Sequence, residues 1–229
     1  RRLDGCWDNG DANCTYAEPD DIALDNDGNI VIAGNAYKTW YGDGGNNQNG
    51  WGSFLIKYDT DGNVLWMSIH HIGYEYINNE NWDQDCNPGH AEYVRSMDIT
   101  DNNDILFSGN GECFGAYSFL VKMDSGGNIL WTKDIAESGI ALQYPYALTS
   151  LSNGNIFIGG YSSNFQGIGL LDSLGNNIAF TSLTQCYNEP YYICNGSVYG
   201  SYETNDGNIV VAGKANFTDQ SWLGDQATL

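Results

Sequence analysis

The chain has 229 residues, which is enough for one substantial core and fits a single all-β domain. It carries 29 Asp+Glu against 8 Lys+Arg, a formal net charge of -21, so its surface potential disfavours nucleic acid and anionic lipid headgroups as partners. No apolar run reaches the roughly 18 residues of a membrane span, so membrane insertion is not expected either.

A repeated pattern organises the chain. The first copy, residues 27–34 (DGNIVIAG), is a polar turn followed by an apolar strand that closes on a glycine. Further copies occupy 103–109, 153–160 and 206–213, and their closing glycines follow one another at intervals of 75, 51 and 53 positions. A recurring unit of about 50 residues, enlarged by insertions in the first copy, is typical of a repeat architecture.

A second pair of strands follows each of the first three copies. Residues 54–66 form a strand, a Gly/Asn turn and a strand ending in Trp; 119–131 repeat this pattern, and 168–180 repeat it in degenerate form. Turns such as DGN favour Gly and Asn because these residues accept a positive φ. In the first unit the strands are predicted at about 20–25, 30–35, 53–58 and 63–69.

Four strands joined by two tight turns are the content of a propeller blade. The sequence therefore predicts an all-β fold, a β-propeller of four-stranded antiparallel blades at approximately 15–70, 91–135, 143–183 and 197–229. The fourth unit ends before its closing strand, so the last blade is expected to be incomplete. Further blades or another chain would then complete the ring, because open sheet edges otherwise remain.

The pattern DGNIVIAG followed by SFLIKYDTDGNVLW resembles propeller repeats in secreted and surface proteins of Bacteroidota, many of them exported by type IX secretion. The resemblance covers roughly residues 19–229. It implies a secreted or cell-surface protein. It does not imply one activity, because those proteins range from adhesins to modules attached to enzymes.

Six cysteines in polar, loop-like contexts favour disulfides and an oxidising compartment. Two pairs with seven residues between them would each close one loop, and elimination leaves a third pair, although six cysteines permit fifteen connectivities. No spacing resembles a zinc site, and no metal or cofactor is expected. The three pairs are Cys6 with Cys14, Cys186 with Cys194, and Cys86 with Cys113.

The long segments rich in aromatic residues belong to one side of the predicted blades, opposite the tight turns. Loops on a rigid scaffold often carry ligand contacts, and Trp or Tyr rings beside polar residues suit a glycan or a protein surface. The alternative is that these rings fill gaps between loops and blades. Trp66 and Trp131 recur at one strand position and are predicted core residues. The candidate ligand-binding residues are Trp40, Tyr41, Trp51, Tyr76, Trp82, Tyr191 and Tyr192.

The leading functional hypothesis is a noncatalytic extracellular binding or adhesion module. A carbohydrate-active enzyme domain is the first alternative, since glycoside hydrolysis needs only two suitably spaced carboxylates, and Asp83, Asp85 and Glu92 are its candidates. A structural repeat of a larger surface fibre is the second alternative. Calcium-loop-like openings at Asp25 and Asp59 lack the closing Glu and are better explained as hairpin turns.

Four residues match short modification motifs. Asn-x-Ser/Thr sequons occur at Asn13, Asn195 and Asn216 and would matter in a eukaryotic secretory pathway. Ser173 lies in Asp-Ser-Leu, a short O-glycosylation pattern associated with Bacteroidota.

Overall fold

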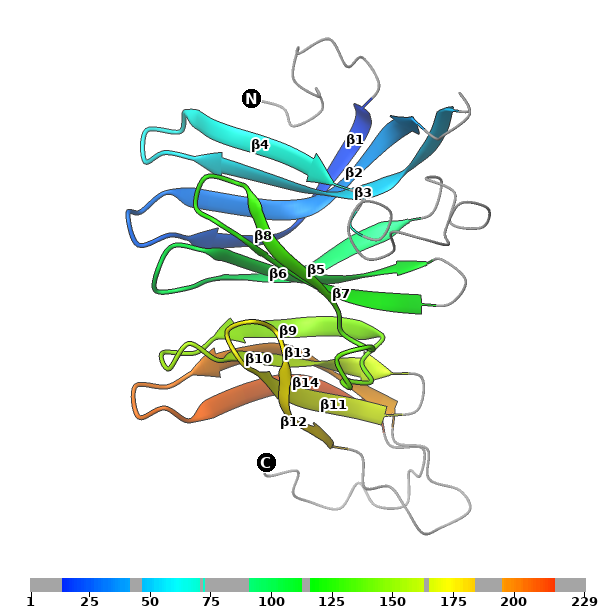
Figure 1. Cartoon of the computed structure of the whole chain (residues 1–229), viewed down its shortest axis with the longest axis vertical. Helices are drawn as coiled ribbons and strands as arrows, with labels where there is room; N and C mark the ends of the chain where they lie inside the picture. The colour runs from blue at the N-terminus through cyan, green and yellow to red at the C-terminus, as the bar shows by residue number, and fades with distance from the viewer. Residues whose placement is uncertain are drawn as a thin grey trace.

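The computed structural model describes residues 14–41, 47–70, 72, 91–112, 116–162, 165–183 and 195–216. Its fourteen described strands form four antiparallel sheets, here named A to D, in which neighbours in the chain are neighbours in the sheet (Figure 1). Sheets A, B and C have four strands each, and sheet D has two described strands. The predicted all-β class and the antiparallel arrangement are confirmed.

The strands follow the repeat. Sheet A contains β1 (Cys14–Leu24), β2 (Ile30–Tyr41), β3 (Asn47–Tyr58) and β4 (Val64–His70). Sheet B contains β5 (Glu92–Ile99), β6 (Ile105–Glu112), β7 (Ala116–Met123) and β8 (Ile129–Asp134). Sheet C contains β9 (Tyr144–Ser150), β10 (Ile156–Ser162), β11 (Phe165–Leu171) and β12 (Asn177–Ser182), and sheet D contains β13 (Asn195–Glu203) and β14 (Ile209–Asn216).

Strands predicted at about 30–35 and 53–58 leave the residues between them as a loop, and this is wrong for most of that segment. Both strands continue, with Tyr37 opposite Trp51 and Tyr41 opposite Asn47. The rings of Tyr37 and Trp51 pack edge to face with centroids 5.7 Å apart. Aromatic and β-branched residues favour strands, and aromatic cross-strand pairs stabilise them, so the hairpin extends beyond the repeat.

In each tight turn, one side chain accepts hydrogen bonds from backbone N–H groups of the same turn. In the first turn, Asp25 Oδ1 accepts from the backbone N–H of Asp27 and of Asn29, at 3.0 and 2.8 Å. The calcium-loop-like acids are therefore occupied as turn acceptors. The second unit has Asn103 where the other turns have Gly, and Asn103 adopts a φ of 64°, which Asn tolerates better than most residues.

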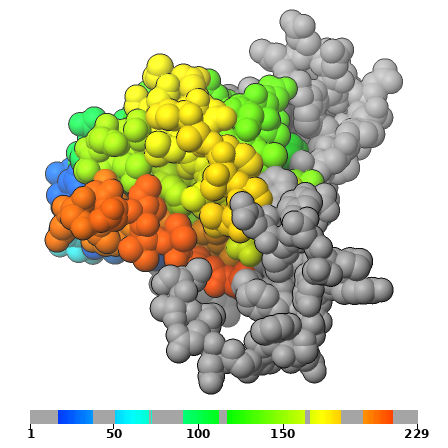
Figure 2. Space-filling model, turned by 90° about the horizontal axis from the view of Figure 1, so that it is seen from below, coloured from blue at the N-terminus to red at the C-terminus, as the bar shows by residue number. Residues whose placement is uncertain are grey.

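The sheets succeed one another in chain order, and their first strands, β1, β5, β9 and β13, contact one another in that order (Figure 1). The β1–β2, β5–β6, β9–β10 and β13–β14 turns lie on one side of the molecule, at the left in this view. The ends of β2 and β6 and the starts of β3 and β7 lie on the other side. Seen from the end of the stack, sheet D (orange) lies at the surface beside sheet C (Figure 2).

Sheet B is covered on both faces. Phe107 and Phe119 belong to a cluster shared with Val31 and Leu55 of sheet A, whereas Leu106 belongs to the cluster shared with sheet C. Because successive side chains of a strand point to opposite faces, an uninterrupted apolar strand buries both sets at once. The predicted core residues Trp66 and Trp131 are half-buried and pack at the edges of these two clusters.

A buried ion pair within sheet A lies against a turn of sheet B. Lys57 Nζ lies 2.7 Å from Asp25 Oδ2, and the two side chains are 6% and 1% exposed. Lys57 Nζ also donates to the Ser125 carbonyl oxygen of the β7–β8 turn at 3.2 Å, and Trp66 Nε1 donates to the same oxygen at 3.0 Å. One turn of sheet B is thereby fastened to two strands of sheet A.

We expect this ion pair to stabilise the folded state at neutral pH and to lose this stabilising effect in acid. Burial alone would raise the pKa of Asp25, but the hydrogen bonds from Lys57 and Asn29 outweigh it and lower the pKa from 3.8 to about 2. A carboxyl whose pKa is lowered by folding stabilises the fold above its unfolded pKa, and this contribution is lost as the pH falls through the folded value. The loss therefore falls between about pH 4 and pH 2.

Denaturant unfolding at several pH values measures the effect. The double variant Lys57→Met/Asp25→Asn lacks the pair, so the wild type should lose stability relative to this variant as the pH falls from 4 to 2. A difference that stays constant over this range would contradict the assigned pair.

Candidate functional site

Every first strand carries a β-bulge at the same position. In β1 the pairing register shifts between Pro19 and Asp21, and in β5 it shifts between Val94 and Ser96. The registers of β9 and β13 shift at the equivalent place. A bulge inserts one extra residue and re-aims its side chain. The inserted residues are Asp20, Arg95, Tyr146 and Tyr199, which we name the bulge row.

These bulges explain why the second strand of each sequence repeat closes on a glycine. Each lies opposite the residue that precedes the inserted one. A Cβ at Gly160 would lie 2.0 Å from the Tyr144 carbonyl oxygen, and a Cβ at Gly109 would lie 2.2 Å from that of Tyr93. A Cβ built at Gly34 or at Gly213 would also lie too close to a backbone carbonyl oxygen, at 2.1 and 2.4 Å respectively. The bulged backbone fills the space that a side chain would need.

Three members of the bulge row, each from a different sheet, are in contact. The guanidinium carbon of Arg95 lies 5.6 Å from the ring centroid of Tyr146. The Tyr146 ring in turn lies 5.3 Å from that of Tyr199, with a 46° angle between the planes. Asp20, the fourth member, interacts electrostatically with Arg95. The bulge row therefore contains one residue from the first strand of each of the four sheets.

Further tyrosines widen this surface. The ring of Tyr144 stacks on that of Tyr146 at 6.2 Å with an angle of 11°, and on that of Tyr161 in β10 at 6.0 Å. Tyr93 is a second ring near Arg95, with its centroid 4.9 Å from the guanidinium carbon. Tyr93, Tyr144, Tyr146 and Tyr161 are half-buried, and Tyr199 is 54% exposed, so the cluster reaches solvent.

The protonation states of this surface follow from its packing. Burial raises the pKa of Tyr146 above its usual value of 10.0, and Arg95 only partly opposes the shift, so the phenol keeps its proton at neutral pH. Burial also raises the pKa of Asp20, and the positive charge of Arg95 lowers it in part. The surface therefore offers phenol hydroxyls as well as ring faces.

The cluster lies toward the side of the long connections. Tyr144 begins β9, Tyr93 lies at the start of β5, and Tyr161 lies at the end of β10. These strand ends are opposite the tight turns, because the turns join the end of each first strand to the start of the second. This is the side on which the sequence predicts the ligand.

The aromatic residues named from the sequence contribute no described side chain to this cluster. Trp51 packs on Tyr37 in the β2–β3 hairpin. Trp40 and Tyr41 lie in β2 of the same hairpin, and their side chains are outside the described residues. Tyr76, Trp82, Tyr191 and Tyr192 also lie outside the described residues.

The cysteine and modification predictions fall mostly outside the described part of the chain. This holds for Asn13 and for every cysteine except Cys14, whose backbone begins β1. Asn195 and Asn216 are paired strand ends in sheet D and not loop residues, because the β13–β14 hairpin extends to them. Ser173 is exposed in the β11–β12 turn. The cysteines outside the described residues are Cys6, Cys86, Cys113, Cys186 and Cys194.

Of the candidate catalytic carboxylates, only Glu92 is described. It is fully buried, and its Oε2 accepts the backbone N–H of Ile72 at 2.7 Å while its Oε1 accepts the Tyr117 hydroxyl. These bonds join β5 and β7 to Ile72, which is a structural role for the Glu92 carboxylate. Asp83 and Asp85 lie outside the described residues.

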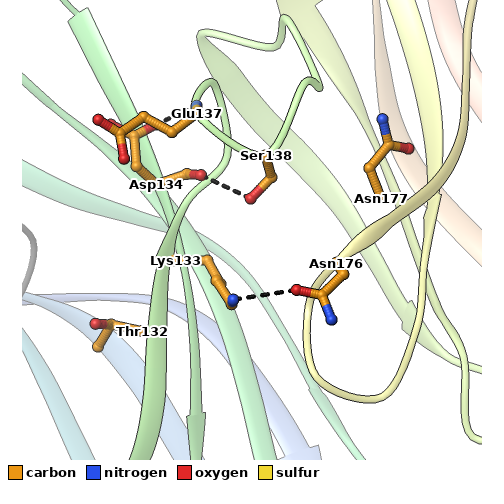
Figure 3. Close-up of a pocket in the computed structure, with 7 residues that line it drawn as sticks. All are labelled: Thr132, Lys133, Asp134, Glu137, Ser138, Asn176 and Asn177. Carbon is orange, nitrogen blue, oxygen red and sulfur yellow. Dashed lines mark hydrogen bonds between the residues drawn. The ribbon is translucent and has the colours of Figure 1, made fainter.

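A polar hollow of about 510 Å³ lies at the periphery, between β8 with its following turn and the β11–β12 turn (Figure 3). Its lining groups already bind one another: Lys133 Nζ donates to Asn176 Oδ1 at 3.3 Å, and the Ser138 hydroxyl donates to the Asp134 carbonyl oxygen at 2.9 Å. The Lys133–Asn176 hydrogen bond joins sheets B and C across this hollow.

Sequence reasoning missed the bulge row, although the chain contains a signal for it. Each member precedes a closing glycine by 14 positions: 20 to 34, 95 to 109, 146 to 160 and 199 to 213. Reading back by this interval selects one residue per repeat, and the type of this residue varies from repeat to repeat.

No family model matches the chain, and no curated protein matches it. Among solved structures, it is similar to one described as a "putative hydrolase from Bacteroides ovatus ATCC 8483", with a TM-score of 0.44 and 10% sequence identity. The similarity covers 87% of this chain and 54% of the other, so this chain spans about half the length of that structure.

Proposed function

We propose that sheets A to D are blades of a β-propeller and that the first strands line its axis. The sequential contacts of β1, β5, β9 and β13 support this arrangement, as does the equivalent bulge in each. Further blades, or another chain, would complete the ring. Side chains at the bulge row would then meet at the end of the axis that faces the long connections.

The proposed function is noncatalytic binding of a glycan at the bulge row. The observation that carries it is the contact series Arg95–Tyr146–Tyr199, in which three sheets each contribute one partly exposed side chain. Tyrosine rings stack against the apolar faces of pyranose rings, and phenol, guanidinium and carboxylate groups bind sugar hydroxyls. Mounting them on rigid strands reduces the entropy lost on binding.

An extracellular location is part of the proposal. It is supported by the resemblance of the repeat to secreted and surface propellers of Bacteroidota and by six cysteines in polar contexts. Within the described residues, no helix combines the length and apolar character needed to cross a membrane.

A glycan array probed with the wild-type chain and with Tyr146→Ala/Tyr199→Ala tests this function. The double variant should lose retention on the glycans that the wild type binds, because both rings of the row are removed. Tyr202→Ala is the matched control: Tyr202 lies in β13 with Tyr199, is 63% exposed and is outside the cluster, so its removal should change nothing. A wild-type chain that binds no glycan, or a double variant that binds equally well, would contradict the proposal.

A further inference from the structure

Arg95 is held in one orientation by three neighbours. Its guanidinium carbon lies 4.9 Å from the Tyr93 ring centroid and 5.6 Å from that of Tyr146, so both rings lie within cation–π range. Its Nε donates to Asn110 Oδ1 at 2.7 Å, and Asn110 is buried at the end of β6. The two rings and the buried acceptor at Nε restrict the orientation of the guanidinium.

The two terminal nitrogens of Arg95 are available to a ligand. Within the residues that the structure describes, Nη1 and Nη2 donate no hydrogen bond, and the side chain is partly exposed. A guanidinium offers a planar fork of donors that matches the two oxygens of a carboxylate, and such paired, charge-assisted bonds are stronger than neutral ones. A fork already fixed in orientation loses little entropy when it binds.

We propose that the bulge row recognises an acidic sugar, a uronic acid unit whose carboxylate is bound by Nη1 and Nη2 of Arg95 while its ring packs on Tyr146. Tyr199 would contact the neighbouring sugar. This inference rests on the proposed glycan-binding function and specifies its ligand class.

The net charge of -21 does not oppose this assignment at physiological salt. The Debye length there is about 8 Å, so repulsion from carboxylates on distant surfaces is largely screened, whereas a direct contact with Arg95 is not. Asp20 is the nearby carboxyl that interacts with Arg95, and burial raises its pKa, which disfavours its charged form. The faces of Tyr93 and Tyr146 also favour a cation beside them, which keeps the guanidinium in place when no ligand is bound.

The test uses matched pairs of oligosaccharides. Oligomers of galacturonate, glucuronate and mannuronate are each compared with their methyl esters, which keep the ring and remove the charge. Affinities of the wild-type chain, Arg95→Gln and Arg95→Lys are measured by titration calorimetry. The wild type should prefer at least one acid to its ester by roughly 10- to 100-fold, the range expected for hydrogen bonds to a charged group.

Arg95→Gln should weaken binding of the acid far more than binding of the ester, so that the preference disappears, and an unchanged circular dichroism spectrum shows that the variant is folded. Arg95→Lys should recover part of the preference, since it keeps the charge but not the fork. Equal affinity for acid and ester, or binding of neutral glycans alone, would overturn the inference and leave glycan binding in place. No binding to any glycan would overturn both.

Discussion

Replacing Lys57 with Met should lower the free energy of unfolding by about 3 to 5 kcal/mol, the cost of leaving a buried carboxylate without its partner. The side chain of Asp25 is 1% exposed, and Lys57 is the cation that faces it, at 2.7 Å. Methionine has a similar length, so the substitution removes the charge and leaves most of the packing. Denaturant unfolding at neutral pH measures the effect.

The double variant Lys57→Met/Asp25→Asn separates the ion pair from the turn. The amide introduced by Asp25→Asn would keep an oxygen for the backbone N–H groups of Asp27 and Asn29 and would remove the uncompensated charge. We expect this variant to recover most of the stability lost in Lys57→Met. If the double variant is as unstable as the single one, the loss comes from packing and the electrostatic explanation is wrong.

The second large effect is expected at a closing glycine. Gly160→Ala would place a Cβ 2.0 Å from the Tyr144 carbonyl oxygen and 3.0 Å from the Pro145 Cα. Both atoms belong to the backbone, so no rotation of a side chain relieves the overlap and the bulge must move. We expect a loss of about 3 kcal/mol, at the upper end of the usual range for overpacking.

Gly200→Ala is the matched control. Gly200 lies in β13 immediately after the bulged Tyr199, and nothing lies within 4 Å of a Cβ built there. Because Ala costs less conformational entropy than Gly in a strand, this variant should be neutral or more stable by about 0.5 kcal/mol. Thermal unfolding of both variants gives the comparison. Equal destabilisation of the two would show that the bulge does not require Gly160.

The all-β class and the strand positions near each tight turn could be predicted from the sequence because they depend on local chemistry. Asx turns, residues that accept a positive φ and two-residue alternation are encoded within a few positions of one another. The second strand of the repeat, predicted at 30–35, indeed begins at Ile30. The extension of β2 to Tyr41 was missed because cross-strand pairing, and not the repeat, decides it.

The site could not be predicted in the same way. The aromatic criterion selected the richest segments, such as the one that contains Trp40 and Trp51, whereas the bulge row has a single residue in each repeat and two of its four members are charged. Glu92 was a candidate acid on sequence alone, and only packing shows that Ile72 and Tyr117 occupy its carboxylate.

The sequence by itself determined where the strands turn and that each second strand ends in glycine, because turn chemistry is local and survives the variation between repeats. The tertiary structure decided why that glycine is there and which residue stands opposite it. A bulge brings the Tyr144 backbone against Gly160 and directs Tyr146 toward Arg95 of the neighbouring sheet. Contacts between residues about 50 positions apart depend on how whole sheets pack, and no local pattern specifies that packing.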